Sequence, residues 1–466
     1  MTAMLIDSHI HLTDRKFARD LDRVLDRARD AGIEQLICIA EDLATSRQTV
    51  ALARRHPCLK ATVGLHPHHE RSLKPEALGE LRRLAGEPGV VAIGEVGLDY
   101  HYPDFSRDRQ RRALVEQARL AGELRLPLVL HCRDAYGDLI DLFEREKALA
   151  SRGVVHCFSG TFEDARRLLD LGFYLGVGGA ISYPNAGRLR ETLKRTGLDR
   201  LVLETDAPYL PPQRKRGRRN EPSYLKFTAK ELADLTGFTY QDVARITTCN
   251  ARRLYGLPEQ AAPALAYAIR RRIYLNVTNR CTNDCCYCER NGDYHLYGHY
   301  LKLPGEPSAE ALLAAIQEPE RYEEFVICGL GEPTLRLDVV LELARALKGR
   351  GFRVRLNTNG HANLIHGRNV APEFAGLFDS VVVTMNAHDR ETYNRISCPA
   401  NPRDSFEAML AFTREVKKHV PDVRLKLLAL PEVDVGACRT IAEDRLKVRF
   451  QVRVPRTNGY PEPLAC

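Results

Sequence analysis

The stretch Leu5-Ile6-Asp7-Ser8-His9-Ile10-His11 guides the interpretation of the whole sequence. Its apolar residues predict a buried strand that ends in two histidines spaced i, i+2. Side chains at this spacing lie on the same side of a strand, so His9 and His11 offer two imidazoles to one point in space. Two imidazoles aimed together are typical ligands of a divalent metal. Chance is the alternative, and the ends of the later strands decide between the two.

The length of 466 residues predicts two domains, because one hydrophobic core rarely extends that far. No apolar run reaches the roughly 20 residues of a membrane span. The N-terminus lacks the basic and apolar regions of a signal peptide. We therefore expect a cytosolic protein that does not bind membranes. The net charge of +8 is mild and dispersed, so it does not by itself indicate nucleic-acid binding.

Apolar strand candidates alternate with helical patterns throughout the first half of the chain. This rhythm over roughly 260 residues predicts an α/β fold, a (β/α)8 TIM barrel. The helical patterns include residues 17–31, 76–84, 106–124 and 162–171. The strand candidates are residues 5–9, 35–39, 60–65, 90–95, 128–131, 154–157, 174–177 and 201–204.

Most of these strands end in a histidine or a carboxylate. In a TIM barrel the chemistry lies where strands end and loops begin. One such residue could be an ordinary polar side chain, but five or six ends of this kind are hard to assign to core packing. The residues are His9, His11, His66, Glu95, His131, His156 and Asp206.

The residue types indicate a centre with two metal ions. Glu95 could bridge two ions with its two oxygens. Two metals polarise an electrophile and generate hydroxide at neutral pH, and Asp206 is the natural general base for the attacking water. Cys132 and Cys157 follow ligand histidines, so strand alternation predicts that they point away from the centre. The remaining ligands are His9 and His11 with Asp206 at one ion, and His131 and His156 at the other.

The first half resembles the TatD family of metal-dependent hydrolases. The resemblance implies a divalent-metal deoxyribonuclease with two ions (Mg²⁺, Mn²⁺ or Zn²⁺) that cleaves phosphodiesters of DNA. It places the metal ligands at His9, His11, Glu95, His131, His156 and Asp206. The motifs that carry it are Asp7-Ser8-His9-Ile10-His11, Gly64-Leu65-His66-Pro67-His68, Gly94-Glu95-Val96-Gly97-Leu98-Asp99, Leu130-His131-Cys132-Arg133-Asp134, His156-Cys157-Phe158-Ser159-Gly160 and Glu204-Thr205-Asp206-Ala207-Pro208.

A basic loop follows the aspartate, and the resemblance includes its Asn-Glu-Pro segment. Alone, residues 214–222 could be a solvated loop. With the resemblance, the loop is expected to contact phosphate. The expected substrate-binding residues are His66, Arg133, Arg216, Arg218 and Arg219.

The first domain is predicted to cover residues 1–257 and to end with a helical pattern at 242–255. Residues 258–266 are rich in proline and alanine and are predicted to be a linker. The second domain is then residues 267–466.

Four of the 13 cysteines fall between Cys281 and Cys288. Cys281, Cys285 and Cys288 have the spacing C-x3-C-x2-C, which can bind three irons of a [4Fe–4S] cluster and leave the fourth iron open. Zinc is the alternative, with a fourth ligand from His295 or His299, although the gap is short for a zinc finger.

This motif resembles that of the radical S-adenosylmethionine (SAM) superfamily. Tyr287 occupies the aromatic position usual before the third cysteine, and Cys328-Gly329-Leu330-Gly331-Glu332-Pro333 resembles the superfamily's Gly-Glu-Pro motif. The resemblance implies a partial (β/α)6 barrel and cleavage of SAM to a 5′-deoxyadenosyl radical. The expected cofactor-binding residues are Gly331, Glu332, Pro333 and Asn357.

The sequence thus predicts a bifunctional enzyme, a nuclease fused to a radical SAM domain that is reduced by a donor such as flavodoxin or ferredoxin. Two alternatives stay open. The first domain could be an amidohydrolase-type esterase, lactonase or deacylase. The radical SAM domain could instead serve only to bind a partner. The radical substrate and the oligomeric state are not predicted.

Overall fold

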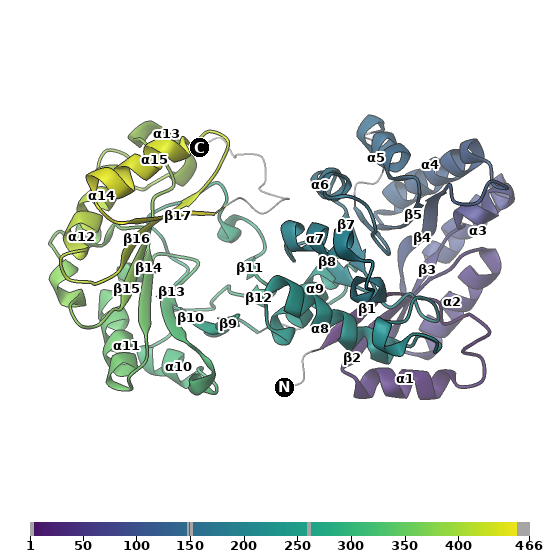
Figure 1. The fold of residues 1–466 in the computed structure, drawn as a ribbon, viewed down its shortest axis with the longest axis horizontal. Coiled ribbons are helices and arrows are strands. Elements are labelled where there is room, and N and C mark those ends of the chain that lie inside the picture. The colour runs from purple at the N-terminus through teal and green to yellow at the C-terminus, as the bar shows by residue number, and fades with distance from the viewer. Residues whose placement is uncertain (1–3, 147–148, 150–151, 259–261, 454–466) are drawn as a thin grey trace. The chain divides into compact units, whose positions relative to one another are not determined.

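A computed structural model describes residues 4–146, 149, 152–258 and 262–453 (Figure 1). The chain divides into two compact units, Met1–Gln260 and Ala261–Cys466. Residues 259–261 of the expected linker and residues 454–466 of the expected second domain lie outside the described residues. The domain boundaries expected from the sequence stay a prediction. Among the described residues, no helix is long and apolar enough to cross a membrane.

The first unit is an eight-stranded parallel barrel in the order β1 to β8, as the sequence predicts. The barrel closes between its first and last strands, where Ile10 pairs in parallel with Ala207. The His11 N–H donates to the Ala207 carbonyl at 2.8 Å, and the Asp206 N–H donates to the His9 carbonyl at 2.9 Å. The hydrogen bonds that close the barrel therefore bring His9 and His11 beside Asp206.

The strands of the first unit lie inside and its helices surround them (Figure 1). The strands are β1 (Leu5–Ile10), β2 (Ile33–Cys38), β3 (Leu59–Val63), β4 (Val90–Asp99), β5 (Leu128–Arg133), β6 (Gly153–Val155), β7 (Tyr174–Val177) and β8 (Leu201–Leu203). The helices are α1 (Leu21–Asp30), α2 (Leu43–Arg55), α3 (Pro75–Ala85), α4 (Arg107–Leu124), α5 (Tyr136–Arg145), α6 (Phe162–Asp170), α7 (Gly187–Thr196), α8 (Leu225–Thr236) and α9 (Tyr240–Tyr255).

The barrel interior is filled by apolar side chains and is closed by α9. Thr239 caps this helix by accepting a hydrogen bond from the Asp242 N–H, and the Asp242 side chain accepts from the Thr239 N–H in return. The amide of Asn250 donates to two backbone carbonyls beside β8, at 2.8 Å each. Because this end is packed, the other end of the barrel is the one left for chemistry. The interior cluster comprises Ile6, Ile37, Ile39, Ala92, Val129, Val154, Tyr174, Val202, Ala251, Leu254 and Tyr255.

Strand β4 continues four residues beyond the range 90–95 expected from the sequence, to Asp99. Its pairing with β5 shifts between Gly94 and Val96, after which Gly97 lies opposite His131. Gly97 has φ +149°, and a Cβ at this position would lie 2.0 Å from the His131 carbonyl oxygen. Only glycine allows the backbones of β4 and β5 to approach so closely at this point. The close approach brings together two neighbouring strands that each carry a site residue.

We predict that Gly97→Ala destabilises the first unit by about 2 kcal/mol or more, since both the close contact and the positive φ oppose a side chain. The change should appear as a lower unfolding midpoint in urea, followed by circular dichroism. Gly79→Ala is the matched control, because the exposed Gly79 in α3 has nothing within 4 Å of its added Cβ. The control should be neutral or slightly stabilising, and equal midpoints for the two variants would contradict the packing argument.

The second unit is built on a seven-stranded sheet in the order β17-β16-β15-β14-β13-β10-β9. Six of these strands run parallel, which confirms the partial (β/α)6 barrel, while β9 is an antiparallel addition that the sequence analysis did not predict. The sheet strands are β9 (Ala266–Ile269), β10 (Arg272–Asn276), β13 (Glu324–Cys328), β14 (Val354–Thr358), β15 (Ser380–Thr384), β16 (Val423–Leu428) and β17 (Arg449–Arg453).

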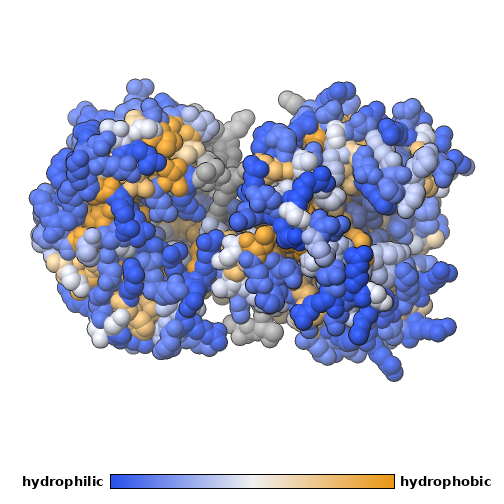
Figure 2. Space-filling view, in the orientation of Figure 1, coloured by the Kyte–Doolittle hydropathy of each residue, from blue (hydrophilic) through white to orange (hydrophobic). Residues whose placement is uncertain are grey.

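Helices pack on one face of this sheet through a core that includes Phe325, Leu356 and Val383. The helices are α10 (Ala309–Ala314), α11 (Leu337–Gly349), α12 (Ala362–His366), α13 (Arg390–Ser397), α14 (Ser405–Val416) and α15 (Val435–Arg439). A short hairpin, β11 (His295–Leu296) and β12 (His299–Tyr300), follows the cysteine loop. In each unit the face shown in Figure 2 is mostly hydrophilic, with apolar residues in smaller patches.

Candidate functional site

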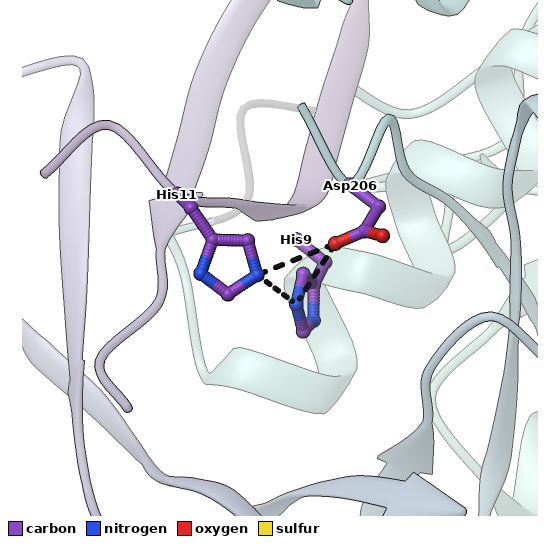
Figure 3. A group of neighbouring side chains, drawn as sticks. All are labelled: His9, His11 and Asp206. Carbon is purple, nitrogen blue, oxygen red and sulfur yellow. Dashed lines mark hydrogen bonds and ion pairs between the residues drawn. The ribbon is translucent and has the colours of Figure 1, made fainter. Parts of the chain in front are cut away.

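The first group of site residues is His9, His11 and Asp206, at the ends of β1 and β8 (Figure 3). The Nε2 atoms of His9 and His11 lie 3.1 Å apart. The Asp206 Oδ1 lies 3.6 Å from His9 Nε2 and 3.3 Å from His11 Nε2. All three residues are buried. Two imidazoles and one carboxylate thus converge on a single point, and their role as ligands of one ion stays a prediction.

The second group is Glu95 within β4, His131 within β5 and His156, the first residue after β6. The Glu95 Oε1 lies 2.8 Å from both His131 Nδ1 and His156 Nε2. The other oxygen, Oε2, lies 3.5 Å from His9 Nε2. Each oxygen of Glu95 therefore serves a different group, which is the arrangement expected of a bridging carboxylate.

The electrostatics of this centre favour a positive charge within it. Burial lowers the pKa of His9 to about 4. Burial also opposes charge on His11, but the neighbouring Asp206 raises its pKa to about 9. Burial opposes charge on His131 as well, but Asp99 and Glu95 raise its pKa to about 9. Protons on His11 and His131 supply positive charge that bound cations could supply instead.

The donor set fits divalent cations. Imidazole nitrogens and carboxylate oxygens are ligands of zinc and of other divalent metals of similar character. The Nδ1 atoms of His9, His11 and His156 have no hydrogen-bond partner among the described residues. A proton on Nδ1 leaves the lone pair of Nε2 directed at the carboxylates. Among the described residues, the groups that could hold an ion include His9, His11 and His156, and also His66.

Asp99 orients His131, a role that the sequence analysis missed. Its Oδ2 lies 3.1 Å from His131 Nε2 and 3.0 Å from His68 Nε2. A carboxylate on the far nitrogen of a ligand histidine fixes its tautomer and its orientation. The signal was present, since Asp99 ends the same motif as Glu95.

Asp7 positions Asp206 in a similar way. The buried carboxylate accepts hydrogen bonds from the Thr205 N–H at 2.9 Å and the Thr205 hydroxyl at 2.6 Å. Burial raises the pKa of Asp7 to about 7. This contact ties the residue before Asp206 to the strand that carries His9.

The expected phosphate-contacting residues lie in different surroundings. His66 is buried, with its Nε2 3.7 Å from Glu95 Oε1. Arg133 is exposed above the Tyr102 ring, while Arg216 is exposed above the Tyr183 ring, and Arg218 is also exposed. Arg219 instead forms ion pairs with Asp20 and Glu221, at 2.7 and 2.9 Å.

The Asn-Glu-Pro segment supports the loop that carries Asp206. The buried Asn220 amide donates to the carbonyls of Thr205 and Tyr209, at 2.7 Å each. Glu221 binds Arg27 and Arg219. No described contact of this segment reaches the centre, and a role in binding substrate stays a prediction.

The expectation for Cys157 is wrong, whereas Cys132 is buried as expected. Cys157 comes after β6 has ended and has φ +44°, so strand alternation no longer applies. Its Sγ lies 4.0 Å from Asp206 Oδ2, and its N–H donates to the buried Glu204 carboxylate at 2.5 Å.

In the second unit the three spaced cysteines lie in the loop that follows β10. The Cys288 N–H donates to the Cys285 carbonyl at 3.0 Å, and the Cys286 N–H donates to the Ile396 carbonyl at 3.0 Å. Cys286 itself packs against the core, as a residue that is not a ligand would. Each of the other three sulfurs accepts from a side-chain N–H: Cys281 from Asn359 at 3.9 Å, Cys285 from Asn386 at 3.6 Å and Cys288 from Arg290 at 3.3 Å.

These contacts fit an iron–sulfur cluster. Three thiols on one loop are the donor set of such a cluster, and N–H groups directed at sulfur stabilise thiolate charge. Burial raises the pKa of Cys281 to about 11 and of Cys285 to about 12, as expected of thiols held away from water.

Glu332 lies beside this loop at the end of β13 and is buried. Its Oε1 accepts from the hydroxyls of Thr334 and Thr358, at 2.6 and 2.7 Å. Its Oε2 accepts from the Asn359 N–H at 2.6 Å. At the end of β14, the Asn357 Oδ1 is buried and has no hydrogen-bond partner among the described residues, which suits a residue that awaits a cofactor.

Comparison with known proteins decides the family. A family model described as TatD related DNase matches residues 6–256, which is more than half of the chain. The chain belongs to the TatD-related DNase family. A second model, the radical SAM superfamily, matches residues 275–443. The protein joins a TatD-type metal-dependent hydrolase domain to a radical SAM domain, as the sequence predicts.

The TatD-type half has well-matched relatives. An uncharacterized metal-dependent hydrolase, YabD of Bacillus subtilis, is 38% identical over 252 residues, which are 54% of this chain and 99% of the relative. The 3′-5′ ssDNA/RNA exonuclease TatD of Erwinia tasmaniensis is 39% identical over 260 residues, covering 54% and 100%. The crystal structure of YJJV, a TatD homologue from Escherichia coli K12, matches with a TM-score of 0.53 at 33% identity, covering 55% and 100%.

Proposed function

We propose that the first unit hydrolyses phosphodiester bonds of single-stranded nucleic acid at two divalent cations. The observation that carries the proposal is the position of Glu95, whose two carboxylate oxygens face separate groups of ligands. The ligands would be His9, His11 and Asp206 for one ion, and His131 and His156 for the other, with Glu95 between them. A relative named as an ssDNA/RNA exonuclease supports the substrate class.

The residues around the two cations would have separate catalytic and positioning roles. Divalent cations, when bound, neutralise phosphate charge and make water more acidic. The Asp206 carboxylate, beside both β1 histidines, would accept the proton of the attacking water. Asp99 would hold His131 in place, and Asp7 would hold the loop that carries Asp206. His66 and Arg133 would contact the phosphate, as would Arg216, Arg218 and Arg219 of the basic loop.

The esterase, lactonase or deacylase alternative would require an apolar pocket beside the centre. Two exposed cations lie close to the centre, Arg133 above the Tyr102 ring and Lys16 above the Tyr209 ring. These charges complement a phosphodiester better than an acyl chain.

For the second unit we propose a [4Fe–4S] cluster on Cys281, Cys285 and Cys288, with SAM held by Gly331, Glu332, Pro333 and Asn357. Cluster and SAM, when bound, supply radical chemistry. A one-electron donor such as flavodoxin or ferredoxin would reduce the cluster. Thiols that must stay reduced fit the cytosol. The domains would be residues 1–257 and 267–466, with the linker at 258–266.

A cleavage assay tests the nuclease proposal. Protein from which a chelator has removed the metal should not cleave single-stranded DNA. Addition of Mg²⁺ or Mn²⁺ should restore cleavage, and single-stranded DNA should be cleaved faster than duplex DNA. A p-nitrophenyl acyl ester and a lactone, assayed in parallel, represent the alternative. Ester hydrolysis without DNA cleavage under every metal would contradict the proposal.

A further inference from the structure

Two exposed tyrosines flank the candidate metal centre. Within the described part of the first unit the exposed large apolar side chains are Met4, Tyr102, Tyr209 and Leu210. Tyr102 is 43% exposed and follows Asp99 by three residues, while Tyr209 is 41% exposed and follows Asp206 by three residues. Each tyrosine therefore stands on a loop that begins at a residue of the centre.

Tyr102 lies beside the group that contains His131. Its ring meets His68 edge-to-face at a centroid distance of 5.3 Å, and the Arg133 guanidinium lies 5.4 Å from its centroid. His68 is itself stacked on Phe105 at 4.4 Å. The contact from His68 to Asp99, and from Asp99 to His131, connects this aromatic surface to the centre.

Tyr209 lies beside the other group. Its ring meets His11 edge-to-face at 5.8 Å, and the Lys16 ammonium lies 4.6 Å from its centroid. The Tyr209 hydroxyl donates to Asp14 Oδ2 at 2.8 Å, which fixes the position of the ring. Both groups of ligands thus have one exposed aromatic ring with a cation beside it.

The chemistry of these pairs fits nucleotides. An aromatic ring at a protein surface binds an unpaired base by stacking, and a neighbouring cation binds the phosphate. The bases of a duplex are already stacked on one another and are not available to such a ring. The strands that carry the two pairs, β4 and β5 for one and β1 and β8 for the other, lie on opposite sides of the barrel.

We propose that the Tyr102–Arg133 pair and the Tyr209–Lys16 pair bind two nucleotides of one single strand, one on each side of the phosphodiester to be cleaved. This inference rests on the proposed function of the first unit and adds the feature that selects single strands. Tyr102 and Tyr209 are binding residues in this proposal. Burial of an otherwise exposed ring against each base supplies the affinity.

The test compares two strands that differ only in their bases. One is a fluorescein-labelled single-stranded oligodeoxynucleotide, and the other is an abasic strand of the same length and phosphate count. The wild-type protein should prefer the strand with bases by about tenfold or more in KM. Tyr102→Ala and Tyr209→Ala should each reduce this preference severalfold, mainly through KM for the strand with bases.

Conservative and remote variants complete the test. Tyr102→Phe retains the ring and should retain the preference, while Tyr209→Phe retains the ring but loses the hydrogen bond to Asp14 and should retain more of the preference than Tyr209→Ala does. Met4→Ala, at the other end of β1, removes an exposed apolar side chain and should leave the preference unchanged. The proposal is overturned if an alanine variant keeps the wild-type ratio of the two KM values, or if its KM rises equally for both strands.

Binding separates this proposal from the hydrolytic one. Fluorescence anisotropy of the same two strands gives their dissociation constants without turnover. A protein that binds the strand with bases more tightly but cleaves neither strand would contradict the proposed hydrolysis and support the stacking sites. Equal binding of the two strands overturns the stacking sites, whatever the cleavage result.

Discussion

Glu95→Gln is expected to reduce metal-dependent phosphodiester hydrolysis by at least about a hundredfold, because loss of several kcal/mol of stabilisation by metal costs that much or more. Glutamine keeps the shape of the side chain but removes the charge that both groups of histidines share. It also places an amide beside His131 and His156, whose nitrogens lie 2.8 Å from Glu95 Oε1. Initial rates with single-stranded DNA and Mg²⁺ give the measurement.

The same variant should bind fewer metal ions per chain, as measured by mass spectrometry of the metal content after dialysis. Glu116→Gln is the control, because Glu116 is a partly exposed carboxylate in α4 that forms an ion pair with Arg119. It should keep full activity and full metal content. Wild-type rates in Glu95→Gln would mean that the measured cleavage does not come from this centre.

Cys285→Ser is expected to abolish SAM cleavage in the second unit. A serine hydroxyl does not replace a thiolate as a ligand of iron at neutral pH, and the other two cysteines cannot hold the cluster in the same form. After anaerobic reconstitution, the variant should lack the cluster's electron paramagnetic resonance signal when reduced and should produce no 5′-deoxyadenosine.

The chain provides its own control for this change. Cys286 adjoins Cys285 but packs against the core, so Cys286→Ser should retain both the cluster and 5′-deoxyadenosine formation. If Cys286→Ser loses the cluster and Cys285→Ser keeps it, the ligand assignment is wrong. If the reconstituted wild-type protein forms no 5′-deoxyadenosine, the role as a partner-binding module gains support.

The grouping of these residues could be predicted from the sequence, because each lies in or directly after an apolar run, and parallel strands of a barrel direct their carboxyl ends to one rim. The strand ends themselves were less predictable, since Glu95 lies inside β4 and four residues of the strand follow it. The position of Cys157 could not be predicted, since the strand before it ends at Val155 and the alternation stops there. Its N–H donates to Glu204, which lies 47 residues away in the chain.

Other features depend on pairings that the sequence does not display. Arg219 belongs to a basic run, yet it binds Asp20, which lies 199 residues away in the chain. The extension of β4 to Asp99 depends on Gly94 and Gly97, which locally suggest a turn but allow pairing with β5. Strand β9 begins at Ala266, the last residue of the expected linker, and pairs with β10 only in the folded unit.

The account depends most on the claim that residues of β1, β4, β5, β6 and β8 hold two cations. Anomalous diffraction from crystals of the full chain grown with Mn²⁺ tests it most directly. We predict two manganese peaks, one among His9, His11 and Asp206 and the other among His131 and His156, with Glu95 in contact with both. A map with no manganese at these side chains, under conditions where the protein cleaves DNA, would contradict the account.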